Sequence, residues 1–206
     1  MFGDFTQRNI NEQLDHAMRL AYIAELREWD NRTHLERVRK YCFLLGEAID
    51  LSYEENVIIA TAAILHDVGK VILPEDLLKK TENFTPAEKK LSEHHTIEGA
   101  QLLENSSSQI LLMGSTIALT HHERWDGSGF PNQLLGDKIP LSGRICALAD
   151  VFDALTTHRS YKPSISSEQA LNLLTDPNQH LFDPIIIKAL VKKYNDFCRI
   201  LNSYQK

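Results

Sequence analysis

The sequence predicts an all-α protein, a bundle of about seven or eight helices. Apolar residues recur at spacings of three and four along most of the chain, which is the period of an amphipathic helix. Several apolar runs follow a serine or threonine with glutamate or glutamine three residues later, which is the signature of a helix N-terminus. The alternation of apolar and polar residues that marks a half-buried strand is almost absent.

The first expected helix covers residues 11–28 and has one apolar face. This face would serve packing within the chain and dimerisation equally well. It is formed by Leu14, Met18 and Ala21. We place a boundary near Asp30, which divides an N-terminal helix or linker (residues 1–30) from the main domain (residues 31–206).

Two helices are expected directly after this boundary. The segment "HLERVRKYCFLLGEAI", residues 34–49, repeats apolar side chains at helical spacing. Ser52 and Glu55 have the spacing of a capping box, in which each side chain accepts a hydrogen bond from the other residue's backbone N–H. The segment that follows them, "NVIIATAAIL", is therefore expected to be helical.

Capping signatures also precede two later segments, "KKLSEHHTIEGAQLL" and "ALNLL". The two pairs are Thr85 with Glu88, and Ser166 with Gln169. Pro86 stands at a first helical position, where its missing N–H costs nothing. Asp183 and Pro184 begin a last helix, "IIIKALVKKY".

Composition and charge exclude several classes of protein. The chain has 206 residues, of which 43% are hydrophobic and 24% charged, and this suits a soluble globular protein. The sequence has neither an apolar run of roughly 20 residues nor a secretory signal, so we expect a cytoplasmic location and no membrane partner. The net charge of −6, without a basic block, argues against long nucleic acid as a partner. The three cysteines stand singly, which argues against a disulfide framework.

Histidine and aspartate residues gather at the ends of the expected helices. They are His34, His66, Asp67, His94, His95, His121, His122 and Asp150. Adjacent helical residues point about 100° apart, so one histidine of each pair could equally face solvent. An acid that follows an apolar run, as Asp67 does, is costly to bury unless it is paired or bound to a metal. Imidazole with carboxylate suits iron, manganese, zinc and related divalent metals.

These residues carry a resemblance to a known family. His34, the His66–Asp67 pair and Asp150 resemble the H…HD…D pattern of the HD superfamily of metal-dependent phosphohydrolases. Three longer segments, "HDVGKVILPEDLL", "HHERWDGSGFP" and "IPLSGRICALADVFDALTTHRSYK", resemble the HD-GYP subfamily of cyclic di-GMP phosphodiesterases. The GYP signature stands here as Gly129-Phe130-Pro131, which loses a hydroxyl and keeps the ring. The resemblance covers about residues 33–194 and implies an HD-type helical bundle.

The resemblance implies a centre of two divalent metal ions, or three if Asp30 reaches it, with iron or manganese typical of the family. Asp67 matches the residue that bridges two ions. His95 is preferred to His94 because it stands four residues before Gly99, as in the family. The full set of implied ligands is His34, His66, Asp67, His95, His121, His122, Asp150 and Asp30.

The implied substrate is a cyclic dinucleotide. The resemblance assigns catalysis to Asp67, Lys70 and Asp153, and phosphate contacts to Lys70, Asp153, Arg159 and Lys162. Asp153 would either orient a basic side chain or assist proton transfer. The implied reaction is hydrolysis of cyclic di-GMP by a hydroxide that two metal ions bridge, and its end product is either linear pGpG or, after a second cut, GMP.

Other functions stay open at this stage. Cyclic GMP-AMP is an alternative substrate. A different nucleotide phosphohydrolase is disfavoured because such enzymes lack the run over residues 121–131. A receptor or scaffold would have lost ligands, whereas every core ligand is present here. Residues 11–28 resemble the linkers that join such domains to sensors, so either the chain is the output module of a longer protein or it pairs with a separate sensory or receiver protein. The same helix could also join two copies of the chain in a homodimer.

Overall fold

The computed structural model describes residues 7–25, 32–158 and 164–204. Regular structure in these residues consists of ten α-helices, two short 3-10 helices and an isolated β-bridge between Asp126 and Leu135. The all-α prediction is therefore confirmed. The helices outnumber the expected seven or eight, because the chain forms one very short helix and because one long expected helix is interrupted.

In chain order the elements are α1 (Gln7–Glu25), α2 (Arg32–Ala48), α3 (Tyr53–Ala63), η1 (Val68–Ile72), α4 (Glu75–Leu78), α5 (Pro86–Glu93), α6 (His95–Leu103), α7 (Gln109–Thr120), η2 (Gly136–Lys138), α8 (Leu141–Thr156), α9 (Ser167–Leu174) and α10 (Pro184–Tyr204).

The interruption lies at His94, between α5 and α6. The N–H of His94 donates to the carbonyl of Leu91, only three residues back, at 3.2 Å. The regular four-residue ladder of an α-helix is broken at this point. The two neighbouring histidines have different surroundings, since His94 is exposed and His95 is buried.

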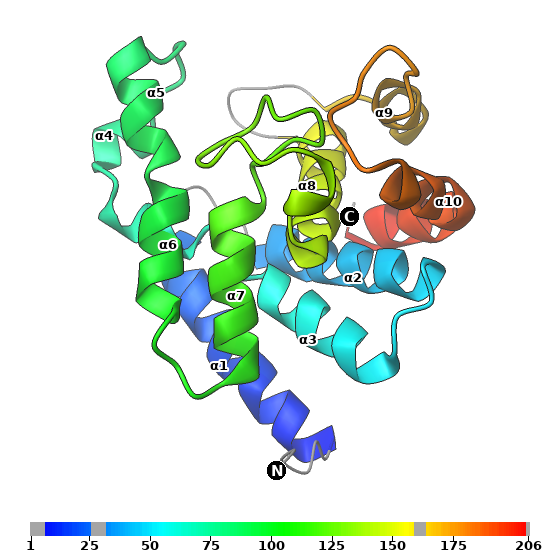
Figure 1. Ribbon diagram of the computed structural model, residues 1–206, viewed down its shortest axis with the longest axis horizontal. Helices are drawn as coiled ribbons and strands as arrows, with labels where there is room; N and C mark the ends of the chain where they lie inside the picture. Colours follow the sequence, from blue (N-terminus) through cyan, green and yellow to red (C-terminus); the bar gives the residue numbers. More distant parts are fainter. Residues whose placement is uncertain (1–6, 26–31, 159–163, 205–206) are drawn as a thin grey trace.

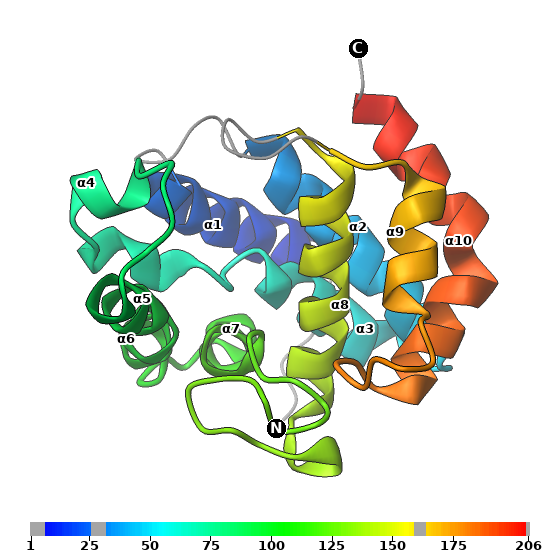
Figure 2. The same ribbon diagram turned by 90° about the horizontal axis from the view of Figure 1, so that it is seen from above.

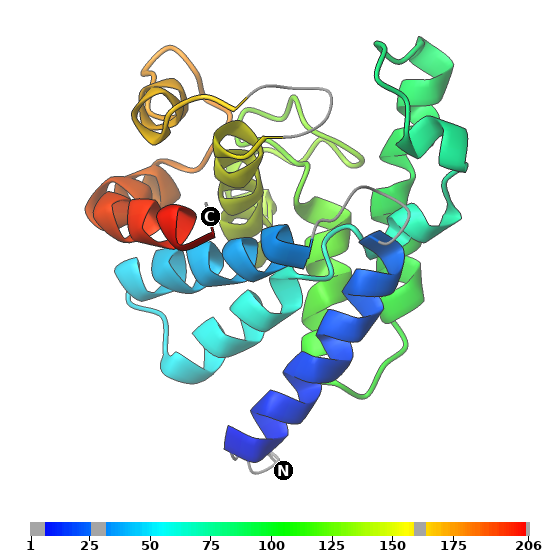
Figure 3. The same cartoon turned by 180° about the vertical axis from the view of Figure 1, so that it is seen from behind.

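Helix α8 lies at the centre of the molecule. Seen from above, it separates α5, α6 and α7 on one side from α9 and α10 on the other (Figure 2). Helices α4 and α5 stand at the edge farthest from α10 (Figure 1), and α1 crosses the back of the bundle (Figure 3). Among the helices of the described ranges, none has both the length and the apolar character that a membrane span requires.

An aromatic cluster fixes α2, α8 and α10 against one another. Tyr41, Phe152 and Phe197 are fully buried, and the rings of Tyr41 and Phe197 stack at 4.4 Å between centroids. Phe152 meets the other two rings edge to face, at 5.3 and 5.0 Å. Burial of each phenylalanine side chain contributes about 1.5–3 kcal/mol of hydrophobic free energy. The cluster therefore holds α2 and α8, which carry His34 and Asp150, in a fixed relation.

Helix α1 packs on the rest of the chain through small residues. Ala17, Ala21 and Ala24 are buried in the common core, and Leu14 and Met18 pack against it. The face that the sequence left open between dimerisation and internal packing is thus used within the chain. The boundary predicted near Asp30 lies outside the described residues and stays a prediction.

The predicted helix caps are confirmed. Ser52, Thr85 and Ser166 each accept a hydrogen bond from the backbone three residues on, and the side chain at that position bonds back. Each such cap satisfies N–H groups that have no partner within the helix. Cys42, Cys146 and Cys198 are free thiols, as the sequence predicted.

Candidate metal centre

Histidine and aspartate side chains from five segments meet in the interior of the bundle. They form two groups, in each of which one donor atom per residue lies within 4.8 Å of the others. The His34 group consists of His34, His66 and Asp150, and the His95 group consists of Asp67, His95, His121 and His122. The structure thus brings together seven of the eight predicted ligands. The eighth, Asp30, lies outside the described residues.

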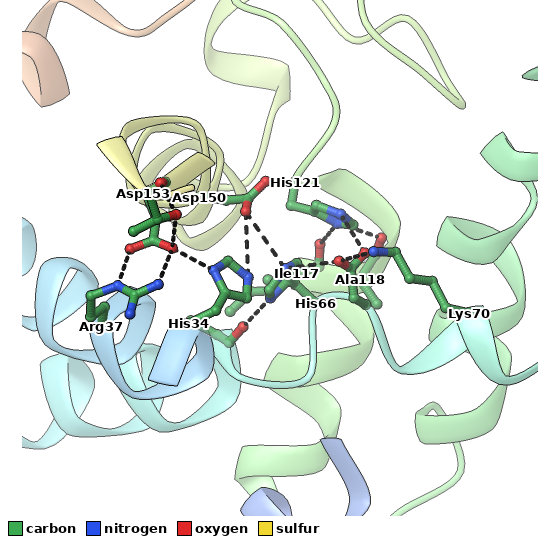
Figure 4. Close-up of polar contacts among 12 residues, drawn as sticks. His34, Arg37, His66, Lys70, Ile117, Ala118, His121, Asp150 and Asp153 are labelled. Atoms are coloured by element: carbon green, nitrogen blue, oxygen red, sulfur yellow. Dashed lines mark hydrogen bonds and ion pairs between the residues drawn. The ribbon is translucent and has the colours of Figure 1, made fainter. Parts of the chain in front are cut away.

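The His34 group joins the start of α2 to the middle of α8 (Figure 4). Asp150 Oδ1 lies 3.6 Å from His34 Nε2 and 3.9 Å from His66 Nε2. The rings of His34 and His66 meet edge to face with centroids 5.4 Å apart. Two imidazole nitrogens and one carboxylate oxygen therefore face a common point.

Asp67 connects the two groups. Its Oδ1 lies 3.2 Å from His95 Nε2 and 3.6 Å from His121 Nε2. Its other oxygen, Oδ2, lies 3.2 Å from His66 Nε2, which belongs to the His34 group. One carboxylate thus presents an oxygen to each group, which is the arrangement expected of a bridge between two ions.

The donor atoms fit a metal because they lack other partners. Among the donor atoms of the two ligand groups, four are buried without a hydrogen-bond partner, namely Nε2 of His66, His95 and His121, and Oδ1 of Asp67. An unsatisfied buried polar atom costs about 1–3 kcal/mol, which makes four of them in one place difficult to explain without a ligand. Their separations of 3.2–3.6 Å suit donors that share an ion, since two ligands about 2.1 Å from a metal are roughly 3.0–3.5 Å apart.

The backbone orients these imidazole rings. Nδ1 of His66 lies 2.8 Å from the carbonyl of Ala63, and Nδ1 of His95 lies 2.6 Å from that of Ser92. Nδ1 of His121 lies 3.1 and 3.0 Å from the carbonyls of Ile117 and Ala118. A carbonyl can only accept, so Nδ1 carries the proton and Nε2 presents its lone pair to the centre.

The charges of the site also favour metal binding. Burial opposes ionisation of Asp67, but Lys70 and His66 outweigh it and hold the pKa of this carboxyl well below its usual value. Burial lowers the pKa of His121 and, together with the neighbouring His121 and His95, lowers the pKa of His122 well below its usual value. At neutral pH the centre therefore offers an Asp67 carboxylate and neutral imidazoles at His121 and His122, the forms that bind a metal. Burial opposes a charge on His66, but the adjacent Asp67 outweighs it and raises the pKa of this imidazole well above its usual value, so a metal at His66 would displace a proton.

Comparison with known proteins identifies the family. The model of the HD domain family matches residues 18–186. The chain belongs to the HD domain family. The match confirms the resemblance to the HD superfamily that the sequence motifs predicted.

Named relatives of this HD domain are cyclic-dinucleotide phosphodiesterases. The chain is 39% identical to 3'3'-cGAMP-specific phosphodiesterase 2 of Vibrio cholerae, over 88% of this chain and 35% of that protein. It is 42% identical to the cyclic di-GMP phosphodiesterase response regulator RpfG of Xanthomonas campestris, over 84% of this chain and 46% of that protein. The chain thus spans less than half the length of these two relatives.

A solved structure shares the fold. It is Bd1817, an HDG"Y"P protein from Bdellovibrio bacteriovorus, with a TM-score of 0.65. The sequence identity is 18%, and the match covers 91% of this chain and 64% of that one. The likeness supports the HD-type helical bundle that the motifs implied.

The glycine-rich turn of the HD domain packs directly on a predicted ligand. The ring of Phe130 stacks on His122 with centroids 4.6 Å apart, and its N–H donates to the His122 carbonyl at 3.2 Å. A Cβ on Gly129 would lie 2.3–2.5 Å from backbone atoms of the preceding turn, so only glycine fits there. The Glu123 carboxylate, which is buried, accepts the N–H groups of Asn132 at 2.7 Å and Leu134 at 2.9 Å. Glu123 thereby ties the far end of the turn to the residue next to His122.

Replacing Glu123 by glutamine is expected to loosen this turn. The amide keeps one acceptor, but its NH₂ group faces a backbone N–H, so a charge-assisted hydrogen bond is lost at a cost of about 1.5–3 kcal/mol. For a chain of this size that corresponds to a fall in Tm of roughly 3–12 °C. Thermal unfolding followed by circular dichroism measures it, with the exposed Glu82→Gln as control. A Tm equal to that of the wild type would show that the carboxylate does not hold the turn.

The residues predicted to contact substrate differ in where they lie relative to the centre. Lys70 lies at the partly exposed edge of the centre, with Nζ 2.8 Å from Asp67 Oδ2. Asp153 is 0% exposed and bonds to Arg37 and His34, so its position argues against the predicted contact with substrate phosphate. Arg159 and Lys162 lie outside the described residues, and their roles stay predictions.

Sequence reasoning missed two residues that support the centre. Arg37 follows His34 by three residues, a spacing that places both side chains on one face of α2 and could have been noticed. Glu123 is adjacent to the double histidine, but its backbone partners depend on the shape of the turn, which the sequence did not reveal.

Proposed function

We propose that the chain is a metal-dependent phosphodiesterase that hydrolyses cyclic di-GMP to linear pGpG and then to GMP. The observation that carries this proposal is the pair of ligand groups joined by the two oxygens of Asp67. The family and the names of the relatives support the substrate class.

The proposed cofactor is two divalent ions, iron or manganese, held by the His34 and His95 groups. A mixed set of imidazole and carboxylate donors suits these metals. Asp30 would add a third ion if it reaches the centre. When bound, such ions supply Lewis acidity at phosphorus and lower the pKa of bound water.

The chain's own residues would bind and orient the substrate. Lys70 is placed beside Asp67 and carries the positive charge that a phosphate at this edge requires. Arg159 and Lys162 follow α8, nine and twelve residues after Asp150, and we assign them to the phosphodiester groups. Arginine can bind two phosphate oxygens at once, whereas lysine acts as a point charge.

A second candidate substrate is 3'3'-cGAMP, because a relative 39% identical to this chain is named for it. Both substrates carry two phosphodiester anions, and they differ in one base. A cytoplasmic location, a sensory or receiver partner and a homodimer stay predictions.

The test is hydrolysis of both cyclic dinucleotides by protein loaded with manganese or with iron under reducing conditions. We expect pGpG and GMP from cyclic di-GMP, at a higher kcat/KM than for cGAMP. The neighbouring histidines give a matched pair of variants. His95→Ala should abolish turnover because it removes a ligand, whereas His94→Ala should retain it because His94 is exposed and outside both groups. A metal-loaded wild type that cleaves neither compound would refute the proposal.

A further inference from the structure

The Asp153 carboxylate is fully buried and bound by two side chains of α2. Its Oδ1 accepts from Arg37 Nε at 2.6 Å, and its Oδ2 accepts from Arg37 Nη2 at 2.9 Å. The same Oδ2 lies 2.8 Å from Nδ1 of His34. Figure 4 shows Asp153 joined to Arg37 on one side and to His34 on the other, with Asp150 and His66 next to His34. This carboxylate therefore has no free face toward a substrate.

The contact fixes how His34 faces the metal. Arginine only donates hydrogen bonds, and a carboxylate held by its fork only accepts them. His34 must then donate from Nδ1 to Asp153, which leaves the lone pair of Nε2 directed toward Asp150, 3.6 Å away. His66, His95 and His121 instead use backbone carbonyls for the same purpose. Of these four histidines, His34 is the one whose Nδ1 donates to a charged carboxylate and not to a backbone carbonyl.

The pairing also sets the register of two helices. On α2, His34 and Arg37 are three residues apart, and on α8, Asp150 and Asp153 have the same spacing. Residues three apart share a helix face. Each helix therefore presents one predicted ligand and one supporting residue to the other. A shift of α2 along α8 would break the Arg37–Asp153 pair and separate His34 from Asp150 together.

We infer that Arg37 and Asp153 are positioning residues, which hold His34 in the orientation and tautomer that bind the metal, and that Asp153 does not contact substrate. This inference rests on the proposed function for its kinetic test, whereas its metal-binding test stands independently. Carboxylate–histidine–metal arrangements of this kind orient the ring and raise the basicity of the ligand.

The experiment measures manganese affinity and steady-state kinetics for Asp153→Asn and Arg37→Lys. Loss of such an outer partner typically weakens metal binding by about 10- to 100-fold, and we expect this for Asp153→Asn. Arg37→Lys should give a smaller loss of manganese affinity. Lysine keeps the positive charge beside Asp153, but it cannot bind both carboxylate oxygens as a fork. In both variants kcat at limiting manganese should fall, excess manganese should restore it, and KM for cyclic di-GMP should not change.

A second arginine–aspartate pair, between the half-buried Arg144 of α8 and the buried Asp183 just before α10, provides the control. Arg144 Nη1 donates to Asp183 Oδ2 at 2.7 Å, and neither residue belongs to a ligand group. Asp183→Asn and Arg144→Lys should lower Tm as the test variants do but leave manganese affinity unchanged. If variants of both pairs lose manganese affinity equally, the loss reflects lower stability of the whole fold, and the inference is overturned. A raised KM with unchanged metal affinity would overturn it in favour of substrate contact.

The two proposals fail in different ways. If the wild type cleaves no cyclic dinucleotide, the proposed function fails, and the manganese titrations still decide the role of Asp153. If cleavage occurs and manganese affinity is the same in wild type and Asp153→Asn, the positioning inference fails alone. The milder Arg37→Lys variant keeps the test decisive where Asp153→Asn does not fold.

Discussion

Replacing Asp67 by alanine is expected to abolish hydrolysis and to remove at least one metal ion per chain. One carboxylate serves both ligand groups, because Oδ1 lies near His95 and His121 while Oδ2 lies near His66. A Lewis-acid metal supplies several kcal/mol of transition-state stabilisation. Loss of about 4 kcal/mol lowers the rate roughly 10³-fold.

Metal content by elemental analysis and turnover of cyclic di-GMP measure this effect side by side. Asp67→Asn keeps the shape of the side chain and should lose turnover as well, since an amide cannot present two anionic oxygens. Asp137→Asn alters an exposed carboxylate near the start of α8 and should behave as wild type. Full metal content in Asp67→Ala would mean that the two groups bind their ions without a bridge.

The helices were predictable where local chemistry decides them. Ser52, Thr85 and Ser166 cap their helices as their spacing to Glu55, Glu88 and Gln169 predicted. The break at His94 was not predictable, because neither glycine nor proline stands there to interrupt the apolar period. Adjacent helical residues point about 100° apart, so helix geometry alone did not show which histidine of the pair is buried.

The ligands of the candidate centre could be predicted from the sequence, but the residues that hold those ligands in position could not. Its members are recognisable because histidine–aspartate pairs stand at helix ends beside apolar runs. The positioning role that we infer for Asp153 was hard to foresee because its partners, Arg37 and His34, lie 116 and 119 residues away in sequence. Motif resemblance alone could not distinguish a carboxylate beside a phosphate from one that holds a ligand from behind. That distinction needed burial and hydrogen-bond geometry.

The close approach of η1 to α6 brings Asp67 beside His95. Gly69, two residues after Asp67, makes this approach possible. A Cβ at this position would lie 1.9 Å from the carbonyl oxygen of His95 and 2.5 Å from the backbone nitrogen of Gly99. Both atoms belong to the backbone, so neither can rotate away as a side chain would.

Gly69→Ala is therefore expected to push η1 away from α6, with a loss of stability and of metal together. Overpacking costs typically 1–3 kcal/mol, and more where backbone must move. We therefore expect Tm to fall by roughly 2–12 °C, or by more if the backbone shifts. The separation of Asp67 from His95 should also weaken manganese binding at the His95 group. Gly114→Ala is the matched control, since its Cβ would meet the flexible end of Leu65 at 2.8 Å and not backbone. It should cost less Tm and keep the metal. A Gly69→Ala protein with wild-type Tm and manganese affinity would show that some other contact sets the distance between Asp67 and His95.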